Sequence, residues 1–361
     1  PVSRFAWYYD QDGYCAEGPG YYNRAAGMLY GITRLLDKLV PGSMEKFYAD
    51  PKNRAMFEFY VHAQIGGDQL SFGDASPLRN PLLSIILSCA GTIHSPALMA
   101  FGRGKTLSIQ RGCGDELNET LSALFDCPEL PVRTACKTLP LSFFKDRLAI
   151  LRTAGFSAAL KAGNNQEPHN HNDLGHFSIY YGEDPVIVDA GTGRYSRINF
   201  SPERYTLWYT RGTGHNAPVF GGIEQVEGSA YALLPEPERT GESVTLSCDL
   251  SNAYPSEAGV RSFFRTMEFA GNKVVIKDSF KLKKKQSVTL NLLTPEKPVV
   301  RNNTIRLGRT MLMLDGIEYA GLETPLEMVH SGSNLWKSPL TRILLKTDRT
   351  SYKLIFSGEK Q

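Results

Sequence analysis

The sequence lacks closely spaced cysteines, long apolar segments and a strong excess of either charge. Its six cysteines include no CxxC pair, so neither a thiol-based zinc site nor a disulfide scaffold is indicated. The most apolar window, residues 82–90, is too short to cross a bilayer and predicts a buried helix, so no membrane partner is expected. The net charge is only +3, and the one dense lysine run, residues 281–285, is typical of a solvated turn or edge strand. Nucleic acid is therefore not an expected partner.

The chain is long enough for two domains, and its patterning changes near residue 140. Before that point, apolar residues at helical spacing predict helices over residues 22–39, 51–63, 81–90, 95–102 and 115–125. After it, short alternating runs predict strands over residues 148–153, 177–181, 186–189, 243–247, 273–277, 287–291 and 351–356. We therefore expect a helical domain over residues 1–139 and an antiparallel β-sandwich over residues 140–361.

Residues 169–216 hold four of the seven histidines of the chain. His169 and His171 form a His-x-His pair, and Asp189 and His215 follow in the same stretch. Imidazole nitrogens and a carboxylate are the ligands that a divalent zinc ion takes in proteins. The stretch therefore predicts a metal site in the β-domain.

The spacing of these residues along the chain limits how they can share one metal ion. On a strand, His169 and His171 would face the same side and serve one cavity together. If residues 177–181 and 186–189 form a hairpin, Asp189 lies opposite Ser178, and a straight chain would place His171 about 23 Å further along. A shared metal therefore requires a sharp turn before the hairpin, and Asn172-Asp-Leu-Gly175 has the residues for one.

Each of these residues also has a simpler interpretation. A single histidine is usually a core or surface residue with a satisfied hydrogen bond, and for His176 this structural role is the better interpretation. Asp189, followed by Ala-Gly, also suits a turn at the end of a strand. The clustering of the histidines is what favours the metal site.

The motifs together resemble a known family. The stretch His169-Asn-His171-Asn-Asp173, with Val-Ile-Val-Asp189-Ala-Gly and His215-Asn216 after it, resembles the C-terminal β-domain of heparinase II/III-like polysaccharide lyases. The N-terminal Asp12-Gly-x-x-x-Glu17-Gly18-Pro-x-Tyr21 and the Phe72-Gly-Asp74 segment resemble the end of the α/α toroid of the same family. The resemblance implies a multidomain α and β protein, in which a partial toroid precedes the antiparallel β-sandwich.

The resemblance implies a lyase that cleaves a 4-linked uronic-acid-containing polysaccharide or oligosaccharide by β-elimination. Such an enzyme must neutralise the uronate carboxylate, remove the C5 proton and protonate the departing O4. An acidic polysaccharide is therefore the expected partner, with heparan sulfate, chondroitin, hyaluronan and alginate as candidates. The family is often periplasmic or secreted, which is the expectation for this protein too.

The resemblance also assigns roles to individual residues. His171, Asp189 and His215 match the metal ligands, whose single zinc has a structural role, and His169 matches the active-site histidine of the cleft. Tyr21 matches the catalytic tyrosine of the toroid, although Tyr22 beside it is equally large. A second catalytic tyrosine from the β-domain corresponds to Tyr195 or Tyr205. The substrate-binding candidates are Glu17, Arg24 and Arg204, the two arginines on the ground of charge.

One departure from the family pattern stands out. A further Asn or His of the toroid, which helps neutralise the carboxylate, lies well upstream of the tyrosine motif in the family, and no Asn or His precedes Tyr21 here. The helical part is also short for a complete toroid. We therefore expect this chain to be the C-terminal portion of a longer lyase, or a family member without the upstream half.

Two functions from other classes remain open at the sequence level. A His-x-His pair with a later Asp and His also suits a metal-dependent hydrolase with a catalytic metal. A non-catalytic carbohydrate-binding relic of the family is the other alternative, with sugar rings stacked on Tyr195, Tyr205, Trp208 and Tyr209. Elimination creates an unsaturated uronate that absorbs ultraviolet light. Neither a hydrolase nor a non-catalytic binding protein would form this product.

Overall fold

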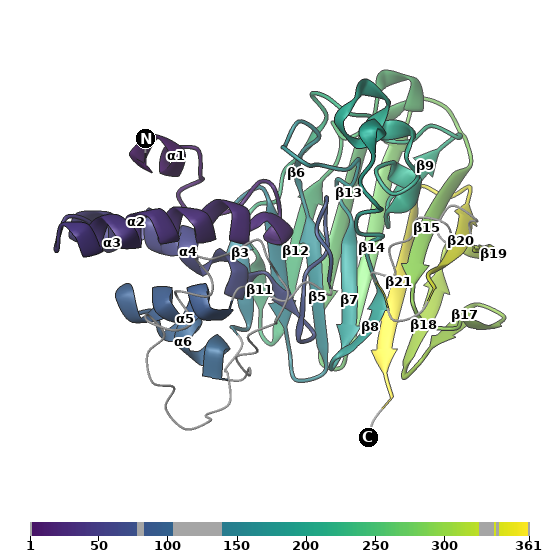
Figure 1. The fold of residues 1–361 in the computed structure, drawn as a ribbon. Coiled ribbons are helices and arrows are strands. Elements are labelled where there is room, and N and C mark those ends of the chain that lie inside the picture. The colour runs from purple at the N-terminus through teal and green to yellow at the C-terminus, as the bar shows by residue number, and fades with distance from the viewer. Residues whose placement is uncertain (1, 78–82, 104–138, 325–335, 337–338, 360–361) are drawn as a thin grey trace. The chain divides into compact units, whose positions relative to one another are not determined.

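The structure is a computed structural model that describes residues 2–77, 83–103, 139–324, 336 and 339–359 (Figure 1). These residues divide into two compact units. The first unit draws on Pro1–Gln64 and Arg79–Leu139, and the second on Ile65–Leu78 and Pro140–Gln361. The short segment Ile65–Leu78 therefore leaves the helical part of the sequence and joins the β-rich part. Across the described ranges, no helix is long and apolar enough to cross a membrane.

The first unit is helical. Its α-helices are α1 (Val2–Trp7), α2 (Met28–Leu39), α3 (Glu45–Ala49), α4 (Pro51–His62), α5 (Leu83–Thr92) and α6 (Pro96–Arg103). Helix α4 begins as the sequence predicts, because the Asp50 side chain accepts hydrogen bonds from the amides of Lys52 and Asn53 and Pro51 occupies the first turn. The predicted helix at residues 22–39 is shorter, since the turn η1 (Pro19–Tyr21) and a π-helical turn η2 (Asn23–Gly27) precede α2.

Helix α5 confirms the buried helix that the apolar window predicts, because its residues 84–90 are all buried. The predicted helices at residues 51–63 and 95–102 correspond to α4 and α6. The predicted helix at residues 115–125 lies outside the described residues.

The second unit consists mainly of three antiparallel sheets. The five-stranded sheet contains, in spatial order, β3 (Leu141–Phe144), β4 (Leu148–Arg152), β5 (Phe156–Lys161), β7 (Phe177–Tyr181) and β8 (Asp184–Ile187). The four-stranded sheet contains β19 (Glu318–Glu323), β20 (Thr341–Thr347), β15 (Val288–Thr294) and β9 (Pro218–Phe220). The eight-stranded sheet contains β11 (Glu238–Thr240), β12 (Ser243–Asp249), β13 (Val260–Phe269), β14 (Lys273–Leu282), β21 (Ser351–Gly358), β18 (Thr310–Asp315), β17 (Thr304–Leu307) and β16 (Val299–Arg301). Two short two-stranded sheets, β1 (Gln64–Ile65) with β2 (Asp68–Gln69) and β6 (Gly163–Asn164) with β10 (Tyr231–Ala232), complete the described strands.

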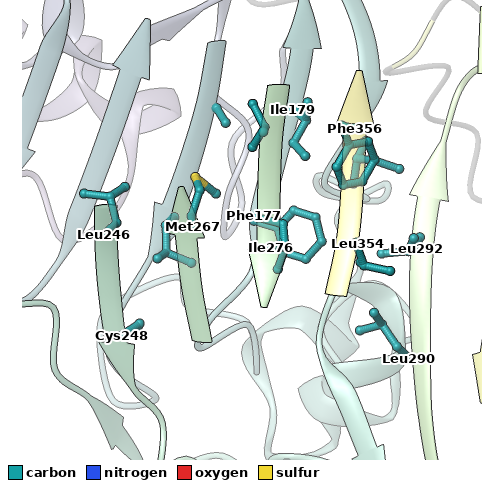
Figure 2. Close-up of a cluster of buried hydrophobic side chains, with 14 of the residues drawn as sticks. Phe177, Ile179, Leu246, Cys248, Met267, Ile276, Leu290, Leu292, Leu354 and Phe356 are labelled. Atoms are coloured by element: carbon teal, nitrogen blue, oxygen red, sulfur yellow. The ribbon is translucent and has the colours of Figure 1, made fainter. Parts of the chain in front are cut away.

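A single hydrophobic core joins the three larger sheets. Figure 2 shows Phe177 and Ile179 of β7, Ile276 of β14, Leu292 of β15 and Phe356 of β21 within one cluster. Strand β14 alternates buried and solvent-facing residues along most of its length, because one face of its sheet packs on this core. Strands β12, β14 and β21 are thus half-buried, as their alternating sequences predict, whereas β4 and β7 are buried on both faces.

The five-stranded and four-stranded sheets meet where β8 ends. The Val188 amide donates to the Leu293 carbonyl oxygen at 2.9 Å, so the chain passes from β8 onto the edge of β15. The Asn216 side chain fastens this junction, because its Nδ2 donates to the carbonyl oxygens of Phe177 and Val188 and its Oδ1 accepts from the Leu293 amide. The junction fixes the backbone directly beside Asp189 and His215.

Candidate metal centre and the adjoining pocket

His171, Asp189 and His215 converge in the second unit. Each offers a ligand atom, and these atoms all lie within 4.8 Å of one another. All three residues are 0% exposed. The structure therefore brings together the three residues that the sequence selected as metal ligands.

The turn that the sequence required is present. The His176 amide donates to the Asp173 carbonyl oxygen at 2.9 Å, and Gly175 adopts a positive φ of 77° that favours glycine. The expected register differs, since Ile179 pairs with Ile187 and Asp189 lies beyond the end of β8 rather than opposite Ser178. The difference arises because the hairpin turn is tighter than expected: Tyr181 already pairs with Asp184.

Two nitrogen atoms identify where a metal ion fits. Nδ1 of His171 and Nε2 of His215 are buried and have no hydrogen-bond partner among the described residues. A buried imidazole nitrogen without a partner is costly unless a ligand satisfies it. The donor set of two imidazoles and one carboxylate is one that zinc takes in proteins, and all three donor residues are fully buried.

Burial and neighbouring charges shift the pKa values of these three residues. Burial alone would raise the pKa of Asp189, but the neighbouring His215 outweighs it and holds that pKa below its usual value. Burial lowers the pKa of His171, which favours the neutral imidazole that a metal requires. Burial would also lower the pKa of His215, but Asp189, whose Oδ2 lies 2.8 Å from Nδ1 of His215, raises it.

His176 has the structural role that the sequence favours. Its Nδ1 accepts a hydrogen bond from the Asn216 amide at 3.2 Å, and its Nε2 lies 3.1 Å from the Ser178 hydroxyl oxygen. Burial lowers the pKa of His176 to about 4, so the ring is neutral near pH 7. The ring supports the backbone next to His215.

Asp74 is a central residue that sequence reasoning missed as a functional candidate. Its buried carboxylate receives hydrogen bonds from Nδ1 of His169 at 3.0 Å and Nε2 of His171 at 3.1 Å. Nη2 of Arg204 lies 2.9 Å from both carboxylate oxygens. Burial would raise the pKa of Asp74, but these partners outweigh it and hold the pKa well below its usual value. The only signal in the sequence was the Phe72-Gly-Asp74 segment within the family resemblance.

His169 lies on a turn rather than on the expected strand. It adopts a positive φ of 57°, and its carbonyl oxygen accepts from the Asp74 amide at 3.2 Å. The expectation that His169 and His171 share one strand face was therefore wrong. The two rings nevertheless converge, because both contact the Asp74 carboxylate.

A pocket of about 440 Å³ opens beside His169. Residues from four separated segments of the second unit line it: Asn165, Gln166, Glu167, His169, Asn170, Asn199, Phe200, Arg204, Tyr205, Glu227 and Gly228. Most of these side chains are polar, which suits a hydrated, hydroxyl-rich ligand better than an apolar one. The metal ligands are not among the lining residues.

Of the two candidate tyrosines in the second unit, Tyr205 lines this pocket. Its hydroxyl donates to Oδ1 of Asn170 at 2.6 Å. Burial raises the pKa of Tyr205, although the Arg204 charge opposes the rise, so the phenol is protonated near pH 7. Tyr195 is 41% exposed, is absent from the lining, and its ring packs against Phe200 with 5.5 Å between ring centroids.

The aromatic residues expected to stack on sugars do not form one surface. Tyr209 is buried and its hydroxyl accepts from Nδ2 of Asn199 at 2.7 Å, while the Trp208 ring packs edge-on against Tyr209. Phe200, which sequence reasoning missed, lines the pocket and is 73% exposed. Phe200 thus joins Tyr205 as an aromatic side chain that can contact a ligand in the pocket.

Arg204 is largely engaged with the protein itself. Besides its contact with Asp74, its Nη2 donates to the Asn170 carbonyl oxygen at 3.1 Å and its Nη1 to the Asn199 carbonyl oxygen at 3.3 Å. Its side chain is 12% exposed. The geometry favours a role for Arg204 in shaping the pocket wall.

The remaining candidates belong to the first unit. Tyr21 is half-buried at the end of η1, whereas Tyr22 is 1% exposed and its hydroxyl donates to the Phe57 carbonyl oxygen at 2.7 Å. Tyr22 is thus a core residue, which leaves Tyr21 as the tyrosine with accessible surface. Glu17 is half-buried and Arg24 is exposed.

Comparison with known families identifies the β-rich part of the chain. Residues 148–321 match the family model described as "Heparinase II/III-like, C-terminal". This range contains the three converging metal-site residues and His169. No curated protein shows significant sequence similarity to the chain.

Several solved structures are similar to this chain over nearly all of its length. A heparinase III, the BT4657 gene product, covers 100% of this chain with 54% of its own length, at 15% identity and a TM-score of 0.71. A mutant of the heparan sulfate lyase HepC from Pedobacter heparinus covers 99% of this chain with 55% of its own, at 15% identity and a TM-score of 0.68. Another structure, titled heparinase III, covers 99% of this chain with 56% of its own, at 12% identity and a TM-score of 0.69. The chain thus spans about half the length of these proteins.

Proposed function

Because residues 148–321 belong to the heparinase II/III-like C-terminal family, we propose that the protein acts as a polysaccharide lyase on a 4-linked uronic-acid-containing glycan. The observation that carries this proposal is the polar pocket lined by His169 and Tyr205, next to a fully buried His/Asp/His set. The proposal concerns the protein of which this chain is all or part, since the similar structures are nearly twice as long.

The two parts of the chain correspond to two domains in this proposal. We propose that residues 1–139 are the end of an α/α toroid and that residues 140–361 are the β-sandwich domain of such a lyase. Segment Ile65–Leu78, which clusters with the second unit, would carry Asp74 from the helical part of the sequence to the β-domain site. Fold similarity to the heparinase III structures supports this assignment.

In the proposed elimination, a base removes the C5 proton, the C5–H electron pair forms the C4=C5 double bond, and the C4–O4 bond breaks. O4 then takes a proton from an acid. His169 suits the base, because its Nδ1–H donates to Asp74 and its Nε2 then carries the lone pair. Tyr205 suits the acid, because its raised pKa keeps the hydroxyl protonated.

The first unit would contribute Tyr21 as a further catalytic tyrosine, with Glu17 and Arg24 as substrate contacts. The assignments of Tyr21 and Glu17 rest on the match to the family motif Asp12-Gly-x-x-x-Glu17-Gly18-Pro-x-Tyr21, and that of Arg24 rests on its charge alone. Tyr195 is the weaker candidate for the second tyrosine, since Tyr205 and not Tyr195 lines the pocket.

Zinc is the proposed metal. His171, Asp189 and His215 would hold it, and its chemistry would be to fix three separate chain segments and balance the buried carboxylate. A catalytic zinc of a hydrolase keeps one position open to substrate. The 0% exposure of all three residues therefore favours the structural role.

Ultraviolet absorbance tests the proposal. The full-length protein is mixed separately with heparan sulfate, chondroitin, hyaluronan and alginate, and absorbance of the unsaturated uronate is followed. We expect absorbance to rise with at least one polymer. Cleavage into reducing ends without absorbance would indicate hydrolysis, and binding without either product would indicate the non-catalytic alternative.

A further inference from the structure

We infer that Asp74 is a positioning residue that couples the metal ligand His171 to His169 of the pocket through one shared carboxylate. The inference rests on the proposed function for its catalytic consequence, although its structural part does not. The Asp74 side chain is 0% exposed, and its hydrogen-bond partners His169, His171, Thr192 and Arg204 belong to the second unit, as Asp74 itself does. Asp74 does not appear among the residues that line the pocket, so its effect on a substrate would be indirect.

The shared carboxylate fixes the proton positions on both rings. An ionised carboxylate only accepts hydrogen bonds, so each imidazole nitrogen that faces it carries a proton. These nitrogens are Nδ1 of His169 and Nε2 of His171. A neutral ring then has its lone pair on the opposite nitrogen, which is Nε2 in His169 and Nδ1 in His171.

The lone pair on Nδ1 of His171 is the one that would bind the metal ion. Nδ1 of His171 is buried and, within the described part of the chain, has no hydrogen-bond partner. The order carboxylate, imidazole, metal is the usual way in which proteins orient a histidine ligand. Asp74 would therefore serve the metal through His171 and the pocket through His169 at the same time.

The backbone reinforces this coupling. The Asp74 amide donates to the His169 carbonyl oxygen at 3.2 Å, and Gly73 adopts a positive φ of 55°. A Cβ atom at Gly73 would lie 2.8 Å from that same carbonyl oxygen. Glycine at position 73 thus permits the close approach of this backbone to the His169 carbonyl oxygen, and the Asp74 carboxylate can then contact the rings of His169 and His171.

The charge of Arg204 completes the arrangement. Nη2 of Arg204 lies 2.9 Å from each Asp74 oxygen and also donates to the Asn170 carbonyl oxygen, next to His169 in sequence. The buried carboxylate is thereby neutralised without a proton, so it stays an acceptor for both histidines. Thr192 adds a contact to Oδ1 at 3.3 Å.

The variant Asp74→Asn tests the coupling, because it keeps the shape and replaces one acceptor oxygen with an NH₂ donor. The asparagine side chain of this variant cannot accept a hydrogen bond from each histidine. We therefore expect zinc affinity, measured by competition with a chelator, to fall roughly 10- to 100-fold. We expect kcat to fall by a similar factor with KM little changed. Asp184→Asn is the matched control, since Asp184 pairs with Arg309 at the surface of the same unit.

Nitrogen NMR of histidine-labelled wild-type protein tests the proton positions without any variant or substrate. The inference predicts the Nδ1–H tautomer for His169 and the Nε2–H tautomer for His171 in metal-free protein. The opposite tautomer at either ring would overturn it, as would an Asp74→Asn variant with unchanged zinc affinity. If Asp74→Asn fails to fold, the NMR result decides. If wild-type protein cleaves no uronate polymer, the proposed lyase function fails, while zinc affinity and tautomers still judge the role of Asp74.

Discussion

Nδ1 of His215 and Oδ2 of Asp189 lie 2.8 Å apart, although 26 positions separate the two residues in the sequence. Asn216 and Val188, their immediate neighbours, are joined by a hydrogen bond of 2.9 Å between Nδ2 and the carbonyl oxygen. The pair is therefore held by the junction of two sheets as well as by its own contact. A metal ion bound there would link this junction to His171 and the turn that follows it.

Removal of the metal is expected to lower the thermal stability of the protein. A ligand that binds only the folded state stabilises it by mass action, so chelation should lower Tm by several degrees. His215→Ala should abolish zinc binding and the chelator effect together. His94→Asn is a suitable control, because His94 is exposed and asparagine tolerates its positive φ. An identical chelator effect in His215→Ala and wild type would contradict the assignment.

Stability should fall in mild acid because of His176. Its pKa is lowered from 6.5 to about 4, so between these pH values the unfolded chain binds a proton that the folded chain does not. The free energy of unfolding contributed by this group is therefore present above pH 6.5 and lost as pH falls toward 4, by on the order of 3 kcal/mol. Urea unfolding of metal-depleted protein at several pH values should show a shallower pH dependence in His176→Gln than in wild type. Equal slopes would count against this role.

The two tyrosines of the second unit should differ in their effect on turnover. Tyr205 lines the pocket and has a protonated hydroxyl, so Tyr205→Phe should lower kcat roughly 10²-fold or more, as expected for loss of a general acid. Tyr195→Phe should change kcat less than about threefold. Tyr195 does not line the pocket, so this substitution removes no proton donor from it. Initial rates of ultraviolet absorbance measure both variants. A larger loss in Tyr195→Phe would reverse the assignment.

A buried ion pair holds the backbone next to the candidate metal site. Nε and Nη2 of Arg265 lie 2.7 Å and 2.6 Å from the two Asp278 carboxylate oxygens, and Nη1 of Arg265 donates to the carbonyl oxygens of Gly175 and Asn216. Asp278→Ala would leave a buried arginine unpaired, so urea unfolding should show a loss of about 3–5 kcal/mol. Asp184→Ala at the exposed pair with Arg309 should have a much smaller effect, because solvent screens that pair. Similar losses in both variants would contradict the supporting role of Arg265.

The sequence predicted the composition of the site better than its shape. His171, Asp189 and His215 could be selected because histidine spacing and a family resemblance pointed to the same residues, and the structure brings them together. The strand expected at His169 is a turn, because a positive φ at one residue has no signature in a polar run of His, Asn and Asp.

Asp74 could not be assigned its role from the sequence alone. It lies 97 positions before His171, in a part of the sequence with mainly helical patterning. Nothing local at Phe72-Gly-Asp74 indicates a partner so far along the chain. Hydrogen bonds between distant residues depend on tertiary packing, which residue spacing does not encode. The strand pattern, by contrast, is local, and it predicted β7 at its observed bounds.

We assign separate roles to two histidines that are close in the sequence, His171 in the metal site and His169 in the pocket. Zinc content by elemental analysis, measured together with uronate absorbance on His169→Ala and His171→Ala, tests this most directly. We predict that His169→Ala keeps one zinc per chain and loses the absorbance change, whereas His171→Ala loses the zinc. Loss of zinc from both variants, or full activity in His169→Ala, would contradict the division of roles.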